Sequence, residues 1–293
     1  MKIEIQHLDK IYPNGKQALS DINLVIENGM FGLLGPNGAG KSSLIRILVT
    51  LLKPSSGSVK IDGYDLIKNR AEIRKMLGYL PQDFRFFSKL KTWEFLDYAA
   101  GLAGIRNKSE RLQRVDAWLE RVGLFDARDR QANNLSGGMK RRLGIAQALI
   151  GSPKIIIVDE PTTGLDPEER IRFRNILSEL SQQDIIIILS THIVADISSV
   201  CRDLALLNNG QLQFNGTPEA LVNKARGHVW RVFTSGVEYD LLKEKYAVTS
   251  TIPSEDGWEI QLVAENPEIN GTPIEPNLEH AYVYFMDSVT DQE

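Results

Sequence analysis

Residues 35–42 read Gly35-Pro36-Asn37-Gly38-Ala39-Gly40-Lys41-Ser42. Two glycines separated by four residues and followed by Lys and Ser form the phosphate-loop pattern. The segment follows an apolar, strand-like run at 30–34 and precedes a helix-like run at 43–48. Small residues let successive backbone N–H groups turn toward phosphate oxygens, and the positive end of the following helix points at them. The segment therefore predicts a nucleoside triphosphate site between a strand and a helix, and not merely a glycine-rich turn.

The side chains that could act on a triphosphate come from this loop and from the end of a second apolar run, at 155–158. Lys41 can reach the β- and γ-phosphates, and Ser42 can ligate magnesium. Adjacent carboxylates at the end of a buried strand point in different directions, so Asp159 can hold magnesium through its waters while Glu160 faces the γ-phosphate. We therefore expect Glu160 to polarise the attacking water; the other interpretation is an exposed acid at a strand end.

Two patterns of apolar residues predict two kinds of strand. Residues 3–5 and 22–26 alternate in polarity, as half-buried antiparallel strands do. Residues 155–158 and 185–189 are continuously apolar, as parallel strands covered by helices on both faces tend to be. Between these two apolar runs, Asp166 can cap a helix. The sequence therefore predicts an α/β fold: a P-loop nucleotide-binding core with a mainly parallel sheet and an N-terminal antiparallel β subdomain.

Helical spacing and charge indicate how the chain divides. Residues from about 92 to 124 are predicted to be helical, within a helical subdomain at about 86–150 that separates the phosphate loop from the second apolar strand. From Glu219 to the end there are 14 Asp plus Glu and 5 Lys plus Arg, a balance of −9, so residues 1–218 carry +5. We therefore predict a nucleotide-binding domain at 1–218 and a small acidic α+β domain at 219–293.

Composition limits the class of protein. The chain has 293 residues and a net charge of −4, which suits a globular protein better than a general nucleic-acid binder. Its apolar runs are far shorter than the roughly 20 residues needed to cross a bilayer, so we expect a cytosolic polypeptide. The single cysteine, Cys201, is expected to be a buried thiol. The cations at 140–142 are interpreted as a solvated or acid-pairing helix face in preference to a nucleic-acid patch.

Four further motifs follow one another along the chain. They are Gln82 in Tyr79-Leu80-Pro81-Gln82, the segment Leu135-Ser136-Gly137-Gly138-Met139, the turn Gly164-Leu165-Asp166, and His192 in Leu189-Ser190-Thr191-His192. Each has a structural explanation by itself, as a loop residue, a helix start, a helix cap or a histidine at a strand end. Together with the phosphate loop they resemble the glutamine loop, signature, D-loop and switch histidine of the ATP-binding cassette ATPases. The resemblance covers about residues 1–218, with Met139 where glutamine is commonest and Ser43 where threonine is frequent.

The resemblance implies a composite site in which two cassettes pair head to tail. ATP and Mg²⁺ would be held by the phosphate loop of one chain and completed by the signature of the other. His192 would hold the γ-phosphate, Gln82 would sense it together with magnesium, and Tyr12 would stack on adenine, unless that aromatic belongs to the core. The implied nucleotide-binding set is Tyr12, Gly35, Pro36, Asn37, Gly38, Ala39, Gly40, Lys41, Ser42, Ser43, Ser136, Gly137, Gly138 and Asp166; the catalytic set is Glu160, His192 and Gln82; the metal set is Ser42, Gln82 and Asp159.

The family contains transporter subunits and soluble ATPases that act on ribosomes or DNA. This chain has one cassette and no sustained heptads. Residues 276–285 resemble the helix that closes the C-terminal domain of bacterial ABC-2 exporter ATPases, although they also read as an amphipathic helix packed on its own sheet.

We therefore predict an ATP-hydrolysing subunit of an ABC-2 exporter, peripheral on the cytoplasmic face of the membrane. Its expected partners are a permease on a separate chain and a second cassette, as a homodimer, with no nucleic acid. The alternatives are a soluble cassette ATPase of a ribosome or nucleic-acid machine, and a regulatory cassette that binds ATP without hydrolysis.

Overall fold

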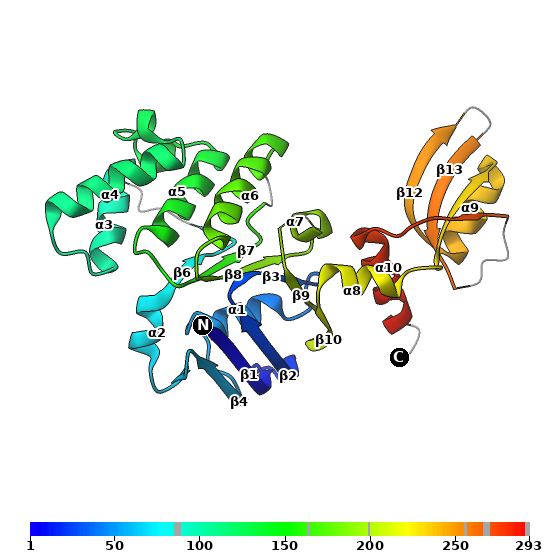
Figure 1. The fold of residues 1–293 in the computed structure, drawn as a ribbon, viewed down its shortest axis with the longest axis horizontal. Helices are drawn as coiled ribbons and strands as arrows, with labels where there is room; N and C mark the ends of the chain where they lie inside the picture. Colours follow the sequence, from blue (N-terminus) through cyan, green and yellow to red (C-terminus); the bar gives the residue numbers. More distant parts are fainter. Residues whose placement is uncertain (85–88, 163–164, 199, 255–256, 266–269, 291–293) are drawn as a thin grey trace. The chain divides into compact units, whose positions relative to one another are not determined.

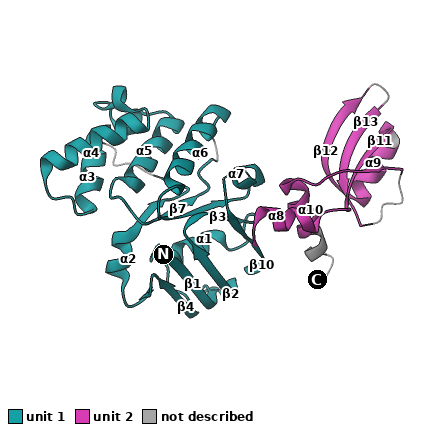
Figure 2. Cartoon of the chain, viewed as in Figure 1, with its two compact units in different colours: residues 1–215 teal, residues 216–293 magenta. Residues whose placement is uncertain are grey.

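The computed structural model describes residues 1–84, 89–162, 165–198, 200–254, 257–265 and 270–290. The chain forms two compact units, Met1–Asn215 and Gly216–Glu293 (Figure 2). Gly164 of the predicted D-loop lies outside the described residues. Within the described ranges, no helix is both long enough and apolar enough to cross a bilayer.

A six-stranded sheet forms the centre of the first unit (Figure 1). Its order is β10-β9-β3-β8-β7-β6, with β3 at Gly29–Leu34, β6 at Leu77–Leu80, β7 at Ile155–Asp159, β8 at Ile186–Thr191, β9 at Asp203–Asn208 and β10 at Gln211–Gly216. The pairs β3–β8, β3–β9, β7–β8 and β6–β7 are parallel. Every residue of β7 and β8 is buried, which explains their long apolar runs. The predicted α/β core with a mainly parallel sheet is confirmed.

The strand order brings three loops to one edge of this sheet. Strand β8 lies between β3 and β7, and the register sets Thr191 beside the last residue of β3 and Ser190 beside Asp159. Because the strands are parallel, the segments that follow them begin at the same edge. These segments are the phosphate loop after β3, Glu160 after β7 and His192 after β8.

An antiparallel sheet packs against the core of the first unit. Its order is β2-β1-β4-β5, with β1 at Lys2–Ile11, β2 at Gln17–Glu27, β4 at Ser56–Ile61 and β5 at Tyr64–Asp65. Alternate residues such as Ile3 and Ile5 of β1 are buried, as the alternating pattern predicts. They share one apolar cluster with helix α1 (Lys41–Leu48) and with the parallel strands β3, β7 and β8. The antiparallel subdomain therefore supports the helix that begins at the phosphate loop.

The remaining helices of the first unit are α2 (Arg70–Met76), α3 (Thr92–Leu102), α4 (Lys108–Arg121), α5 (Gly137–Leu149), α6 (Pro167–Ser181) and α7 (Val194–Ser198), with 3-10 turns at Phe125–Ala127 and Ala132–Asn134. In Figure 1, α5 and α6 lie on one side of the parallel sheet and α1 on the other. Helix α5 begins at Gly137, directly after Ser136, because the Ser136 hydroxyl caps it by accepting a hydrogen bond from the Met139 N–H. Cys201 is buried as predicted, and burial raises the pKa of its thiol to about 12.

The second unit is a small α+β structure. Its antiparallel sheet has the order β12-β13-β11-β14, and its elements are α8 (Pro218–Lys224), β11 (Val229–Thr234), α9 (Gly236–Lys245), β12 (Ala247–Ser254), β13 (Gly257–Val263), β14 (Thr272–Pro273) and α10 (Leu278–Thr290). Val232, Ile260 and Leu262 form its apolar centre, against which Trp230 and Trp258 pack. Helix α10 contacts β12 and β13 and buries Leu278 and Ala281, as expected of an amphipathic closing helix.

His280 is buried near the start of α10, with both ring nitrogens in hydrogen bonds. Nδ1 accepts from the backbone N–H of Asn277 at 3.2 Å, so Nε2 has the proton and donates to Gln261 Oε1 at 3.0 Å. Burial lowers the pKa of the imidazole, and the nearby Glu279 opposes this shift. The second unit therefore contains the neutral form of His280.

We expect the second unit to lose stability as the pH falls, because the unfolded chain binds a proton at His280 more readily than the folded unit does. This contribution is complete above the ordinary pKa of 6.5 and is lost as the pH falls below it. Hydrogen-exchange protection factors for the α10 amides, compared at about pH 7.5 and about pH 5.5, measure the loss. His280→Gln should weaken the pH response; an equal response in both proteins would contradict this role of His280.

Candidate nucleotide-binding site

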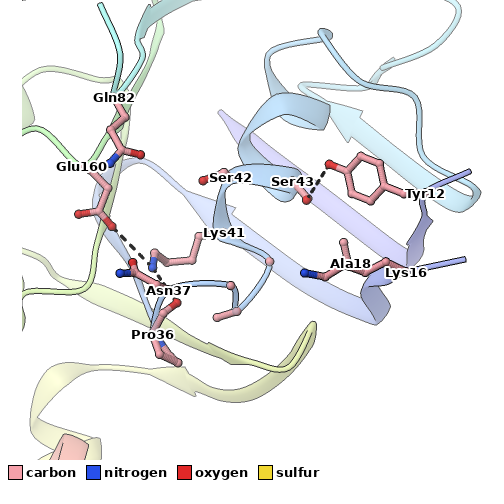
Figure 3. A pocket seen from close by; sticks show the side chains of 13 residues that line it. Tyr12, Lys16, Ala18, Pro36, Asn37, Lys41, Ser42, Ser43, Gln82 and Glu160 are labelled. Atoms are coloured by element: carbon pink, nitrogen blue, oxygen red, sulfur yellow. Dashed lines mark hydrogen bonds and ion pairs between the residues drawn. The ribbon is translucent and has the colours of Figure 1, made fainter. Parts of the chain in front are cut away.

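A pocket of about 270 Å³ lies over the phosphate loop (Figure 3). Its described lining consists of Tyr12, Lys16, Ala18, Pro36, Asn37, Gly38, Ala39, Gly40, Lys41, Ser42, Ser43, Gln82 and Glu160. Parts of the sequence that are far apart thus meet: the first hairpin, the phosphate loop with the start of α1, and the segments after β6 and β7. In Figure 3 the Glu160 carboxylate points toward Lys41, with Gln82 close by.

The path of the phosphate loop requires glycine at two places. Gly40 has φ +106°, and a Cβ there would lie 2.5 Å from the carbonyl oxygen of Ala18 in β2. A Cβ on Gly35 would lie 2.2 Å from the carbonyl oxygen of Leu207 in β9. The backbone is therefore in close contact on two sides, and α1 begins directly after it at Lys41. A loop of this kind at the N-terminus of a helix suits an anionic phosphate.

Lys41 is buried at the bottom of the pocket and held by the loop itself. Its Nζ donates to the carbonyl oxygens of Gly35 at 2.6 Å and of Pro36 at 3.1 Å, and it lies 3.6 Å from Glu160 Oε1. Burial lowers the pKa of this amine, while the Glu160 carboxylate opposes the shift. The ammonium group of Lys41 therefore lies inside the phosphate loop, in the pocket where phosphates could bind.

Glu160 is the carboxylate on which this site is centred. It is 5% exposed, and its φ of +48° is unusual for a residue with a side chain. Its N–H donates to the carbonyl oxygen of Ser190 at 2.9 Å, which ties the turn to β8. The carboxylate lies between Lys41 and His192, whose Nδ1 is 2.7 Å from Oε2 and therefore donates to it. A buried carboxylate paired in this way can accept a proton from water or orient it.

Asp159 is the last residue of β7 and lies deep in the same edge. Within the described ranges, its Oδ1 is buried and has no hydrogen-bond partner. Burial raises the pKa of the carboxyl group, against the effects of the neighbouring Ser190 and Lys41. No group of three or more His, Cys, Asp or Glu that could hold a metal occurs in the described part of the chain. An unpaired carboxylate oxygen fits hydrated Mg²⁺, which keeps several waters and needs few protein ligands.

The first hairpin supplies one predicted lining residue and two that sequence reasoning missed. The Tyr12 hydroxyl lies 3.1 Å from Ser43 Oγ, so the ring stands at the rim beside the start of α1. Lys16 and Ala18 also line the pocket. The Tyr12 N–H donates to the Lys16 carbonyl at 2.9 Å across the turn, so the hairpin places the two residues together. The recognisable turn at 13–15 was the signal that could have identified Lys16.

Four predicted residues lie away from this pocket. Ser136 and Gly137 are exposed at the start of α5, and Gly138 is half-buried, with a Cβ position 3.3 Å from the Glu169 side chain. Asp166 caps α6 by accepting from the Glu169 N–H at 2.9 Å. None of the four is among the described residues that line the pocket. In one chain, the phosphate loop and the carboxylates therefore lie together, and the segment predicted to be the signature lies elsewhere.

A buried aspartate, missed by sequence reasoning, connects two loops of the site. Asp196 of α7 is 3% exposed and accepts hydrogen bonds from the hydroxyls of Thr162 and Thr191. Thr162 follows the β7 carboxylates, and Thr191 precedes His192. Asp196 thus fixes the end of β8 against the segment that leads toward the predicted D-loop.

The three cations after the signature differ in their environments, and the expectation of a solvated or acid-pairing face is wrong for Arg141. Arg142 does pair with an acid: its Nε is 3.1 Å from Glu169 Oε2. Arg141 instead donates to backbone carbonyl oxygens of two segments, 81–82 and 159–161. The reason is that α5 packs beside β6, so this position of the helix faces the loops at the sheet edge.

Comparison with known sequences finds ATP-binding proteins of ABC transporters. Residues 19–163 match the family described as ABC transporter. The "Probable multidrug ABC transporter ATP-binding protein YbhF" of Escherichia coli K12 is 33% identical over 99% of this chain and 53% of the relative, so the chain spans about half its length. The "Uncharacterized ABC transporter ATP-binding protein YxlF" of Bacillus subtilis 168 is 35% identical over 92% of this chain and 88% of the relative.

Solved structures agree with this fold. One described as the ATP-binding subunit of an ABC transporter is 29% identical, with a TM-score of 0.70 over 76% of this chain and 93% of that one. A dimeric ATP-binding cassette bound to ADP and Pi in a post-hydrolysis state is 26% identical, with a TM-score of 0.68 over 73% and 98%. Taken with the likeness to YxlF over most of both chains, this shows that the protein belongs to the ABC transporter family, among its ATP-binding proteins.

Proposed function

We propose that this chain hydrolyses ATP to ADP and phosphate and so powers a membrane exporter of the ABC-2 type. The main support is the position of the Glu160 carboxylate, which is buried at the phosphate loop between Lys41 and His192. A pocket for a triphosphate with a buried, oriented base at one wall suits hydrolysis better than passive binding.

Each group in or beside the pocket has a distinct role in this reaction. The backbone of the phosphate loop and Lys41 bind the phosphates, and His192 holds the γ-phosphate and orients the attacking water. Glu160 accepts a proton from that water as it attacks. Mg²⁺, held by Ser42, Gln82 and, through water, Asp159, would neutralise charge that develops on the phosphate oxygens. Tyr12 provides an aromatic face for adenine at the rim.

The proposed working unit is a pair of these chains. Ser136, Gly137 and Gly138 do not line the described pocket of their own chain, yet Ser136 and Gly137 are exposed at the start of a helix, where an anion could approach. In the head-to-tail pair, the signature of one chain completes the ATP site of the other. A solved cassette of similar fold is dimeric with ADP and Pi, which supports the arrangement.

The proposed membrane partner is a permease on a separate chain, contacted on the cytoplasmic face. A groove of about 280 Å³ lies beside β6, the strand that leads to Gln82, and its lining includes Tyr79, Ala99 and Leu102. Leu102 is 73% exposed, and Tyr98, on the same helix, is 49% exposed. These apolar side chains suit an inserted helix of the permease. YbhF is named as a probable multidrug transporter protein, which supports export.

Glu160→Gln should reduce the rate of phosphate release at least about a hundredfold, because an amide cannot accept the proton from water. Binding of a fluorescent ATP analogue should persist, since the phosphate loop is unchanged. Glu168→Gln is a matched control: the Glu168 side chain is 88% exposed on α6. Turnover close to wild type in Glu160→Gln would refute the assigned base.

Lys41→Ala should weaken ATP binding by roughly tenfold or more, because it removes a charge-assisted hydrogen bond to the phosphates. The affinity can be measured by titration calorimetry in the presence of Mg²⁺. Lys60→Ala, which changes an exposed lysine of β4, controls for the loss of a positive charge. If Lys41→Ala bound ATP as tightly as the control, the phosphate-loop assignment would fail.

The partner is tested with tagged Glu160→Gln protein expressed in its native host and purified with ATP. We expect recovery from membranes together with a protein of several membrane spans, and loss of that protein when Leu102→Asp is added. Leu102→Asp alone should retain basal ATPase activity. Recovery with ribosomes or DNA-bound proteins would instead favour the soluble machine ATPase and overturn export.

A further inference from the structure

The guanidinium group of Arg141 reaches two separate loop segments at once. Nε donates to the carbonyl oxygen of Pro161 at 2.8 Å; Nη1 donates to those of Gln82 at 3.0 Å and Pro81 at 3.3 Å; Nη2 donates to those of Glu160 at 2.5 Å and Asp159 at 3.2 Å. A planar guanidinium has five N–H donors in fixed directions. Every nitrogen of this one is used, and all five acceptors belong to the backbone.

The contact at Glu160 explains how its backbone conformation is maintained. A φ of +48° places this residue in the left-handed region, which is unfavourable for a side chain and persists only where the surroundings hold it. Its N–H is fixed by the carbonyl oxygen of Ser190, and its C=O is fixed by Arg141. This conformation directs the carboxylate toward Lys41 and His192.

The second segment held by Arg141 is the backbone at Gln82, a residue that lines the pocket close to Glu160 (Figure 3). Arg141 itself is not among the described lining residues, so it acts through its neighbours. It lies on α5, the helix that begins at the signature. One side chain therefore joins the signature helix, the glutamine loop and the backbone of the proposed base.

We propose that Arg141 is a positioning residue for ATP hydrolysis, which fixes Glu160 and Gln82 relative to each other and to the signature helix. The inference rests on the proposed ATPase function. In a head-to-tail pair, the signature of a chain contacts the nucleotide bound by its partner. Arg141 then connects that contact to the base of the chain's own site, so that the two nucleotides can influence each other through one side chain.

Charge and shape both favour arginine at this position. Burial lowers the pKa of the guanidinium, and the carboxylates of Asp159, Glu160 and Asp83 oppose the shift, so the group remains charged. Lysine would keep the charge, but its single ammonium group cannot reach two segments in the fixed directions of the guanidinium. Lysine should therefore hold one segment and release the other.

The test compares Arg141→Met and Arg141→Lys with Arg111→Gln. Arg111 of α4 is a matched control, since it also donates to two carbonyl oxygens, of Ile105 and Arg106, and pairs with Asp97, all within the helical subdomain. We expect Arg141→Met to lower kcat by roughly ten- to a hundredfold with KM for ATP nearly unchanged, because a displaced base impairs chemistry more than binding. Arg141→Lys should give an intermediate kcat, and Arg111→Gln a kcat close to wild type.

Hydrogen exchange supplies a readout that does not depend on turnover. Arg141→Met should speed exchange in peptides that contain the amides of Gln82 and Glu160, and Arg111→Gln should not. Wild-type kcat and unchanged exchange in Arg141→Met would overturn the proposal, as would an equal loss of kcat in Arg111→Gln. If the wild type hydrolysed no ATP, the proposed function would fall, and the exchange data would still decide whether Arg141 holds these two segments.

Discussion

Burial of the Glu160 carboxylate is the constraint around which the first unit is organised. A buried charge costs several kcal/mol unless it is paired and hydrogen-bonded. Here the compensation comes from Lys41 at 3.6 Å and from His192 at 2.7 Å, which belong to loops after two other strands. The cost of burying the carboxylate is therefore compensated only when all three strand ends are in place. As a result, the geometry of the site depends on correct folding of the sheet.

The order of the strands brings these three groups together. With β8 between β3 and β7, the loops that contain the cation, the imidazole and the carboxylate begin at neighbouring positions. Further contacts then fix the backbone within this arrangement. The carbonyl oxygen of Ser190 and the guanidinium group of Arg141 hold the backbone of Glu160, and the Asp196 carboxylate joins the segments after β7 and β8.

Sequence reasoning reached what depends on short, local patterns. The phosphate loop, the buried parallel strands and the cap at Asp166 depend on neighbours in the chain, and the structure has the corresponding elements. Arg141 was misread because its partners are backbone carbonyls about 20 and 60 residues away, which no spacing in the sequence reveals. Asp196 was missed for a similar reason, since it joins two loops, whereas the turn at 13–15 was a local signal for Lys16 that was not used.

The exposed signature has a consequence for how energy is used. On the proposed pairing, a single chain binds ATP but lacks the groups that complete its site. It therefore does not hydrolyse the bound ATP. Two chains must meet before turnover begins, and the frequency of meeting rises with local concentration. A permease that holds two copies side by side would supply that concentration. ATP hydrolysis would then be confined to assembled transporters, because only there does each site receive the signature of a second chain.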